Sequence, residues 1–460
     1  SAQRFDVMNP ATEDVIASVA SADIFDADLA LNAASTAMQE WAARSPRDRS
    51  EVLRKAWELM TARLPEFARL ITLENGKANA DAMGEANYAA EFFRWFAEEA
   101  VRVDGLISHA PASGARIIVQ HKPAGIAVLV TPWNYPAAMG TRKIAPALAA
   151  GCAVIIKPAS ETPLTMLALM PLLEEAGVPK GVVNVLPSRN TGVLVDHMLH
   201  DPRVRVVSFT GSTEVGRKLL HSAADQILKP AMELGGNAPA IVFEDANLDV
   251  AVEGVMLAKM RNLGEACTAA NRIYVHSSIA PAFTEKFTSA MAELKIGNGL
   301  EAGIDVGPLV NSDTRNKVDA FVQDAVAKGA KVELGGVLPT GKGFFYPPTV
   351  LSGVPETADC VGDEIFGPVA ALQVFNDQED VIRRANDTEY GLVAYVFSED
   401  MKRALQVCER LDYGMVGLNR GLVSDPAAPF GGTKQSGLGR EGGHEGMHEF
   451  METQYISASW

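Results

Sequence analysis

Three residues in separate segments have side chains suited to chemistry on a carbonyl group. Cys267, in GEACTAANR, supplies a thiol that becomes a nucleophile once its pKa is lowered, although a lone cysteine is more often a buried structural residue. Glu233 precedes two glycines in MELGGNAP, which favours a water-accessible general base or simply a solvated surface carboxylate. Asn134, between two prolines in TPWNYP, is a rigidly placed donor for an oxyanion, or else part of an Asx turn.

A fourth segment, FTGSTEVG, joins an apolar run to a helical pattern. Gly211 and Ser212 fall at that turn, where the free N–H groups of a helix start can meet a phosphate. The dinucleotide fingerprint GxGxxG is absent, and an ordinary strand-to-helix turn gives the same pattern. The segment therefore indicates a phosphate site only where its context agrees.

Alternating strands and helices are predicted to position these residues. Apolar residues recur at helical spacing over about 26–99, and short β-branched runs alternate with helical patterns over 125–242 and again further along. Gly151 is expected to close one helix, and Thr162 with Pro163 to begin the next. The pattern predicts an α/β fold with two doubly wound parallel-sheet lobes, a Rossmann-like cofactor-binding domain and a catalytic domain.

The predicted domain division follows this alternation. Residues 1–104 and 121–233 form the cofactor-binding domain, and residues 234–425 form the catalytic domain. Segments 105–120 and 440–460 lie outside the alternation and are expected to pair as β-strands of an oligomerisation arm. A homodimer or homotetramer is the expected assembly.

Composition excludes several classes of protein. The chain has 460 residues, 47% of them hydrophobic, and a formal net charge of −16, so nucleic acid and anionic membranes are poor partners. Its four cysteines lack CxxC spacing, which fits neither a disulfide framework nor a zinc site and favours a reducing cytoplasm. No signal-peptide pattern or bilayer-spanning apolar run is visible. We therefore expect a cytoplasmic protein that binds no metal.

The motifs together resemble the aldehyde dehydrogenase superfamily in order and spacing, as do KPASETPLT, EIFGPV and PFGGTKQSGLGREGG. The resemblance covers nearly the whole chain, and the joint match is specific although each motif alone is not. It implies that the Cys267 thiolate adds to an aldehyde while the Asn134 amide and the Cys267 backbone N–H hold the oxyanion. Glu233, with its pKa raised by partial burial, would then activate the water that hydrolyses the thioester.

The resemblance also implies a nicotinamide cofactor. Lys157 is expected at the adenosine ribose, Gly211 and Ser212 at the pyrophosphate, and Glu364 at the nicotinamide ribose. The expected cofactor-binding residues are Trp133, Lys157, Ser160, Gly211, Ser212, Glu364 and Phe366. NAD-preferring members often carry a carboxylate three residues after the lysine, where it repels a 2′-phosphate, so Ser160 favours NADP. Ser160 could instead help to cap a helix, and Glu161 could reach the ribose, which keeps NAD as the alternative cofactor.

Arg142, Arg261 and Ser424 are similar to the carboxylate-binding group of the succinate-semialdehyde dehydrogenases within this superfamily, and Phe430 is expected in the same pocket. Guanidinium groups pair with carboxylates through charge-assisted hydrogen bonds, so an anionic semialdehyde would be held with its carbonyl at Cys267. Succinate semialdehyde is the expected substrate. Glutarate semialdehyde and neutral aliphatic aldehydes are the alternatives, because sequence does not give the cavity depth.

Two other classes of protein share parts of the pattern. A non-catalytic relative could keep the fold as a structural or binding protein, but intact Cys267, Glu233 and Asn134 speak against it. A thioesterase-like hydrolase could use the cysteine and glutamate without redox chemistry. The phosphate turn, the lysine motif and EIFGPV would then have no purpose.

Three positions depart from the family pattern. Glu265 replaces the usual Gln, and its charge would oppose thiolate formation at Cys267 unless the carboxylate points away or is paired. Ala269 replaces a second cysteine found in some relatives, so no adjacent redox disulfide can form. Arg420 replaces a small polar residue. An ion pair between Arg420 and Asp425 is favoured over a role for Arg420 at the substrate mouth.

Overall fold

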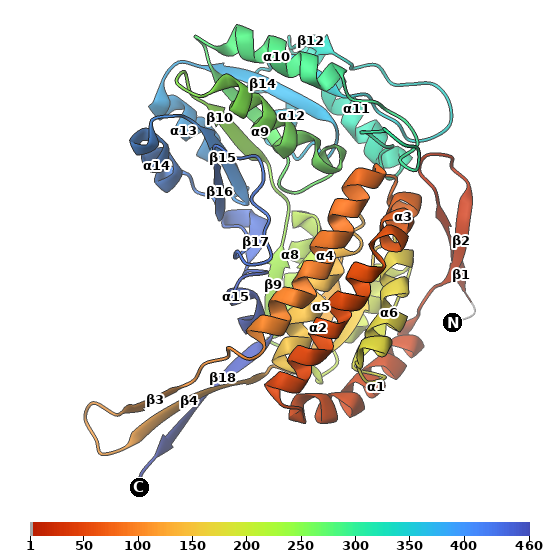
Figure 1. Cartoon of the computed structure of the whole chain (residues 1–460), viewed down its shortest axis with the longest axis vertical. Coiled ribbons are helices and arrows are strands. Elements are labelled where there is room, and N and C mark those ends of the chain that lie inside the picture. The colour runs from red at the N-terminus through yellow and green to blue at the C-terminus, as the bar shows by residue number, and fades with distance from the viewer. Residues whose placement is uncertain (1–2) are drawn as a thin grey trace.

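Two parallel sheets, each covered by helices on both faces, make up most of the molecule, and a narrow β-arm projects from one of them (Figure 1). The computed structural model describes residues 3–460. This architecture confirms the predicted α/β class with two doubly wound lobes. Among the described residues, no helix is both long and apolar enough to cross a membrane.

The first sheet has the strand order β17-β9-β8-β5-β6-β7, with β17 antiparallel and the other strands parallel. Its strands are β5 (Ile126–Val130), β6 (Ala153–Lys157), β7 (Val183–Val185), β8 (Val204–Thr210), β9 (Lys229–Glu233) and β17 (Gly437–Leu438). Because the strands are parallel, the residues that follow β5, β6, β7 and β8 all emerge at the same edge.

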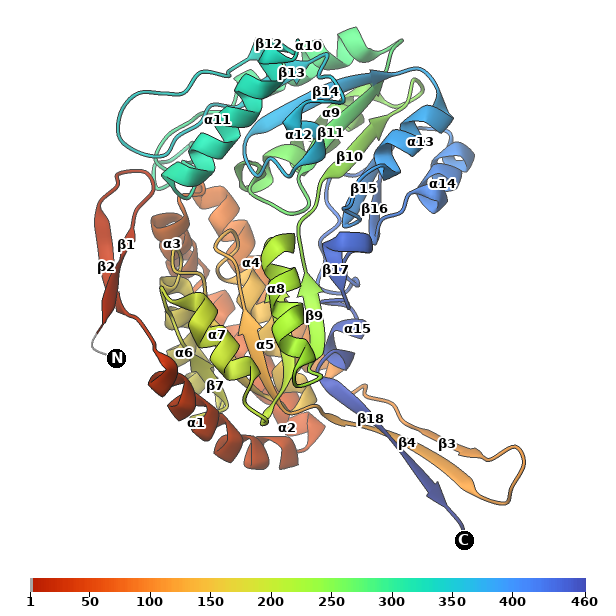
Figure 2. The ribbon, with the colours of Figure 1, turned by 180° about the vertical axis from the view of Figure 1, so that it is seen from behind.

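Helices cover both faces of this sheet because its central strands are apolar on both sides. In β5, Ala127 and Leu129 pack on the face that carries α2 to α6, whereas Ile126 and Val128 pack on the face that carries α1 and α7 (Figure 2). The helices are α1 (Ile24–Ala43), α2 (Pro46–Ala62), α3 (Leu64–Asn75), α4 (Asn79–Glu99), α5 (Ala138–Ala150), α6 (Leu164–Ala176), α7 (Thr191–Leu199) and α8 (Thr213–Ala224).

The second sheet has the order β12-β13-β14-β11-β10-β15-β16, parallel except for β12. Its strands are β10 (Ala238–Val242), β11 (Ala270–His276), β12 (Lys331–Leu334), β13 (Thr349–Ser352), β14 (Val369–Phe375), β15 (Val393–Phe397) and β16 (Met415–Leu418). The helices around it are α9 (Leu248–Met260), α10 (Ala280–Ala292), α11 (Ser312–Ala327), α12 (Asp359–Gly362), α13 (Gln378–Asn386) and α14 (Met401–Arg410).

The arm is a three-stranded antiparallel sheet built from distant parts of the chain. β4 (Arg116–Pro123) pairs on one side with β3 (Leu106–His109) and on the other with β18 (Met451–Ala458), which confirms the predicted strand pairing of the two segments. α15 (Glu445–His448) precedes β18. A separate hairpin of β1 (Arg4–Met8) and β2 (Val15–Ala20) reaches from the first lobe toward the second (Figure 1).

Helix ends show where local prediction succeeds and fails. Gly151 closes α5 with a φ of 98° and donates its N–H to the Ala147 and Leu148 carbonyls, as predicted. The predicted cap of α6 by Thr162 is wrong, because that hydroxyl donates to the Trp133 carbonyl. The buried carboxylate of Glu74 in α3 instead accepts the first two N–H groups of α6, at 2.6 and 2.8 Å. A tertiary contact has replaced the local one.

Candidate active site

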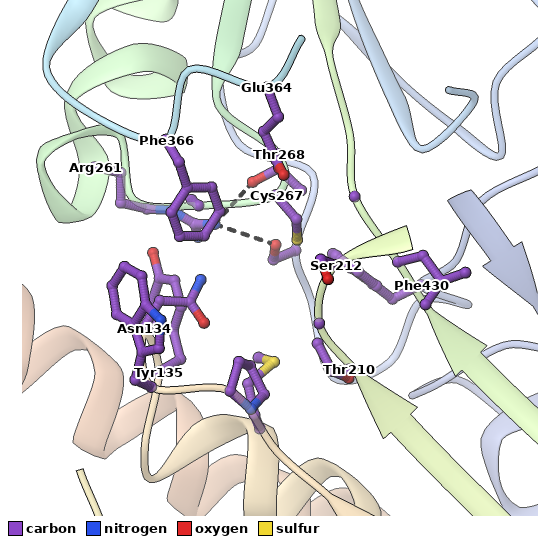
Figure 3. Close-up of a pocket in the computed structure, with 18 of the residues that line it drawn as sticks. Asn134, Tyr135, Thr210, Ser212, Arg261, Cys267, Thr268, Glu364, Phe366 and Phe430 are labelled. Atoms are coloured by element: carbon purple, nitrogen blue, oxygen red, sulfur yellow. Dashed lines mark hydrogen bonds between the residues drawn. The ribbon is translucent and has the colours of Figure 1, made fainter. Parts of the chain in front are cut away.

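A cavity of about 260 Å³ lies between the two lobes and collects most of the predicted site residues (Figure 3). The residues predicted from sequence that line it are Trp133, Asn134, Arg142, Gly211, Ser212, Arg261, Cys267, Glu364, Phe366, Ser424 and Phe430. Glu233, Lys157 and Ser160 do not line this cavity. Buried polar atoms around it lack a hydrogen-bond partner within residues 3–460: the Tyr88 and Tyr135 hydroxyls, Asn134 Oδ1, Arg142 Nη2, Thr210 Oγ1 and both Glu233 oxygens. Such a concentration of unsatisfied groups is typical of a ligand site.

Cys267 follows a strained turn between α9 and β11. Asn262 and Leu263 have positive φ values of 53° and 44°, a conformation that residues with a Cβ rarely adopt. The Asn262 side chain stabilises the turn by donating to the Glu265 and Asn134 carbonyls at 2.9 and 3.0 Å. On the other side, a Cβ at Gly236 would lie 2.3 Å from the Cys267 carbonyl oxygen, so only glycine lets the two backbones pass. The thiol is therefore held by the backbone on both sides.

Asn134 is fixed from both of its ends. Its Nδ2 donates to the Glu265 carbonyl at 3.0 Å, and its own carbonyl accepts from the buried Lys77 ammonium at 2.6 Å. Lys77 is in turn paired with the buried Glu85 carboxylate. No Asx-turn hydrogen bond from Asn134 is found in the described chain, so the amide is held for the cavity and not for its own loop.

Burial changes the protonation of the two central reactive groups. Burial raises the pKa of Glu233 to about 8, against the effect of the Arg142 charge. Burial also raises the pKa of the Cys267 thiol, and the nearby Glu233 carboxylate adds to this rise. The expectation of a water-accessible Glu233 is wrong, since its side chain is 3% exposed at the end of β9. Its two carboxylate oxygens have no hydrogen-bond partner among residues 3–460, and its nearest cation is Arg142, whose Nη2 lies 3.7 Å from Oε2.

Arg142 belongs to a buried charged cluster behind the cavity. Its Nε donates to Glu441 Oε2 at 2.5 Å, its Nη2 lies 3.7 Å from Glu233 Oε2, and its guanidinium carbon lies 4.1 Å from the centroid of the Phe430 ring. Lys143 also pairs with Glu441 and donates to Ser208. Burial opposes the charge of Arg142, but Glu441, Tyr88, Glu233 and Cys267 together outweigh it, and the pKa of the guanidinium is raised. Arg142 is therefore a fixed cation whose charge Glu441 largely compensates.

Arg261 is the contrasting cation of the cavity. Its Nη2 donates to Thr268 Oγ1 at 3.2 Å, a bond drawn as a dashed line in Figure 3, and to Ser424 Oγ at 3.5 Å. This guanidinium forms no ion pair within 4 Å in the described chain, although the buried Asp81 carboxylate, which lines a neighbouring cavity with it, interacts with its charge. Thr268 adjoins Cys267, so Arg261 places a positive charge that lacks a direct ion-pair partner one residue from the thiol. Arg261 and Ser424, predicted as partners from sequence, do meet.

The cofactor side of the cavity fits a dinucleotide. The Lys157 ammonium, on a side chain 4% exposed, makes no hydrogen bond or ion pair in residues 3–460, and burial lowers its pKa to about 8. Ser212 caps α8 by accepting from the Val215 N–H at 3.4 Å, and leaves the other first N–H groups of that helix for an anion. Glu364 accepts from the Gly236 N–H at 3.2 Å and keeps lone pairs for a ribose hydroxyl.

The structure shows what surrounds the residues that depart from the family pattern. Glu265 is fully buried, its Oε1 accepts from the Val310 N–H at 3.2 Å, and burial raises its pKa well above its usual range. A neutral carboxyl that faces away does not oppose a thiolate. The expected ion pair between Arg420 and Asp425 is not found in the described chain, and Asp425 Oδ1 instead accepts from the Ala427 N–H at 2.9 Å. Ser160 caps no helix and donates to Glu161 at 3.2 Å.

Sequence reasoning missed several residues of the site. Tyr88 and Tyr135 line the cavity, and Lys143 and Glu441 form the cluster around Arg142. Glu441 stands within GLGREGG, a motif already linked to the family, and its placement between glycines was an available signal. Tyr88 lies in the middle of α4 with no local signal.

Comparison with known proteins agrees with this geometry. The model of the Aldehyde dehydrogenase family matches residues 1–456. The succinate-semialdehyde dehydrogenase of Paenarthrobacter nicotinovorans is 52% identical over 96% of this chain and 98% of its own length. The glutarate-semialdehyde dehydrogenase of Pseudomonas putida is 48% identical over 99% and 95%. A crystal structure of an NADP-dependent enzyme from E. coli superposes with a TM-score of 0.98 at 45% identity, over 100% of this chain and 95% of that one.

Proposed function

Because the chain belongs to the aldehyde dehydrogenase family, we propose that it oxidises an anionic semialdehyde to the dicarboxylate, with succinate semialdehyde as the preferred substrate and NADP preferred over NAD. The observation that carries the substrate is Arg261, a guanidinium without a carboxylate partner beside Cys267. A succinate-semialdehyde dehydrogenase shares half of this sequence, which supports the same substrate.

Arg261 selects the substrate by charge. A substrate carboxylate meets a guanidinium whose present partners are two neutral hydroxyls, so binding adds charge-assisted bonds without breaking an ion pair. Ser424 adds a hydroxyl donor to the same carboxylate. Arg142, already paired with Glu441, adds positive potential and the donor at its unpartnered Nη2. The two arginines therefore contribute unequally.

The chemistry proceeds in two steps on Cys267. The thiol first gives its proton to a base, for which the neighbouring Glu233 carboxylate is available. The thiolate then attacks the aldehyde carbon, and the tetrahedral oxyanion accepts from the Asn134 amide and the Cys267 backbone N–H. The nicotinamide of bound NADP would accept the hydride that the tetrahedral carbon loses, so that a thioester to Cys267 remains. Glu233 then removes a proton from the water that hydrolyses the thioester, and its pKa of about 8 makes it a base matched to neutral and mildly alkaline solution. Arg142 holds Glu441 beside this base.

The cofactor is held by residues from both lobes. Lys157 and Ser160 bind the adenosine ribose, and Gly211 and Ser212 at the start of α8 bind the pyrophosphate. Glu364 accepts from the nicotinamide ribose. Trp133 and Phe366 complete the cofactor site, and their rings meet edge to face with centroids 5.4 Å apart.

The arm assembles the enzyme as a homodimer or homotetramer. Exposed apolar side chains gather on its strands and at the chain end, with Ile107 71%, Tyr455 58% and Trp460 78% exposed. The outer edges of β3 and β18 have no strand partner in the described chain, which supports a further strand or sheet from another copy. Residues 105–120 and 440–460 serve as this assembly element, while residues 1–104 with 121–233 and residues 234–425 serve as the two domains.

Glutarate semialdehyde is the second candidate substrate. Arg261 lines a neighbouring cavity of about 210 Å³ as well as the main one, together with Tyr88, Tyr135 and Ser424. A guanidinium that is open to both cavities can follow a carboxylate that lies one methylene further from Cys267. The relative from Pseudomonas putida supports this alternative.

One set of initial rates tests the proposal. Nicotinamide reduction is followed with succinate semialdehyde, glutarate semialdehyde and butanal, each with NADP and NAD, for the wild type and Cys267→Ala. We expect kcat/KM to be highest for succinate semialdehyde with NADP and to vanish in Cys267→Ala. A higher kcat/KM for butanal would contradict the anionic substrate, and equal rates with both cofactors would contradict the NADP preference.

A further inference from the structure

The loop after β7 lies beside the end of β6, where Lys157 is expected to meet the adenosine ribose. The Leu186 N–H donates to the Ile156 carbonyl at 2.9 Å, so the chain beyond Leu186 runs beside Lys157 at the carboxyl edge of the first sheet. Arg189 follows three residues after Leu186. Ligands of open parallel sheets bind at this edge, which places Arg189 next to the lysine expected at the adenosine ribose.

Arg189 combines a fixed backbone with an available guanidinium. Its N–H donates to Ser21 Oγ at 3.2 Å, and the preceding Ser188 hydroxyl donates to the Ala22 carbonyl at 2.8 Å. Its side chain is exposed, donates at 3.5 Å to the Asp6 carbonyl and lies 5.4 Å from the centroid of the Phe5 ring. No carboxylate lies within 4 Å of it in residues 3–460. The guanidinium therefore has one long hydrogen bond and a ring contact but no ion pair, so an anion can approach it without displacing a carboxylate.

The charges that face this subsite are two cations and one carboxylate. Burial lowers the pKa of Lys157, the Glu161 carboxylate opposes this effect, and the positive charge of Arg189 strengthens it. Ser160 donates its hydroxyl to Glu161 at 3.2 Å. An arginine fork matches a phosphate, whereas a carboxylate accepts from a hydroxyl and repels a phosphate. The subsite thus holds an arginine suited to the 2′-phosphate of NADP and a carboxylate suited to the 2′-hydroxyl of NAD.

We propose that Arg189 binds the 2′-phosphate of NADP, and that Glu161 accepts a hydrogen bond from the 2′-hydroxyl of NAD. This inference rests on the proposed use of a nicotinamide cofactor with NADP preferred, and it assigns that preference to a charged residue outside the lysine motif. Serine at position 160 avoids the repulsion that a carboxylate there would exert on a 2′-phosphate, but it supplies no positive charge to attract one. Arg189 supplies the attraction, and Glu161 keeps NAD usable.

Binding of two small probes tests the proposal without catalysis. Adenosine 2′,5′-bisphosphate and 5′-AMP differ only in the 2′-phosphate, and the affinity of the full chain for each is measured by isothermal titration calorimetry. We expect the wild type to prefer the bisphosphate, and Arg189→Ala to lower the affinity ratio on the order of tenfold, as for the loss of a charge-assisted hydrogen bond. Arg189→Lys should retain part of the ratio, and Glu161→Ala should increase it.

A matched control uses Arg205, an exposed arginine near the amino end of β8, at the opposite edge of the same sheet. Arg205→Ala should keep the wild-type ratio, and thermal unfolding should show that Arg189→Ala is folded. A wild type that binds both probes equally would refute the NADP preference and this inference with it. A wild type that prefers the bisphosphate together with an unchanged ratio in Arg189→Ala would overturn the role of Arg189 alone.

Discussion

Replacement of Arg261 by glutamine separates recognition of the substrate charge from the chemistry. In the substrate-free site the guanidinium donates to two neutral hydroxyls and forms no ion pair within 4 Å in the described chain. Two charge-assisted hydrogen bonds to a substrate carboxylate contribute about 3–5 kcal/mol, and one neutral bond from glutamine retains about 1 kcal/mol of this. The difference of about 2–4 kcal/mol corresponds to a loss of roughly 30- to 900-fold in kcat/KM, at about 1.36 kcal/mol per factor of ten.

The assay compares kcat/KM for succinate semialdehyde and for butanal in the wild type and Arg261→Gln. Butanal has the same chain length without the carboxylate, so its kcat/KM should change little. Arg410→Gln, an exposed arginine on α14 that pairs with Glu379, serves as the control for a lost surface charge. Equal losses for the two aldehydes would refute the reasoning, because they would show that Arg261 only maintains the shape of the Cys267 loop.

Further predictions concern the base, the buried cluster and the arm. Hydrolysis of the thioester should accelerate as pH rises through about 8, because Glu233 acts as a base only after it loses its proton, and Glu233→Gln should remove this limb and accumulate acyl-enzyme in rapid-quench experiments. Glu441→Gln should lower the free energy of unfolding by about 3–5 kcal/mol in urea titrations, because two buried cations lose their carboxylate. The control Glu452→Gln, at an exposed position, should leave the free energy of unfolding unchanged. Equal effects of the two substitutions would contradict the ion-pair account. Deletion of 451–460 should reduce the mass measured by light scattering to that of a smaller species, and an unchanged mass would exclude β18 from assembly.

Features that depend on a short stretch of sequence could be predicted from the sequence alone. Gly151 carries its own helix end, and Cys267, Asn134 and Glu364 lie in motifs whose order is specific, so the cavity could be anticipated residue by residue. Pairing of the arm strands followed from their position outside the alternation. The helix end and the motif residues are local features, whereas the arm pairing joins segments more than 300 positions apart and was inferred only because both lie outside the alternation.

Long-range partners could not be predicted in this way. The cap of α6 comes from Glu74, about ninety positions away, and the partner of Arg142 is Glu441, about three hundred positions away. Burial, which decides the protonation of Glu233 and Glu265, is likewise a property of the packed lobes and not of the flanking residues. The protonation state of a titratable residue therefore cannot be deduced from the sequence until its neighbours in the folded structure are known.

The last stretch of the chain completes three features at once. Gly437 pairs with Glu233 along β17, Glu441 neutralises Arg142 and Lys143, and β18 adds the outer strand of the arm. All of these residues leave the ribosome after both lobes have been synthesised. A nascent or prematurely terminated chain thus lacks the edge of the catalytic strand, the counter-charge of the buried arginine and the outer arm strand together.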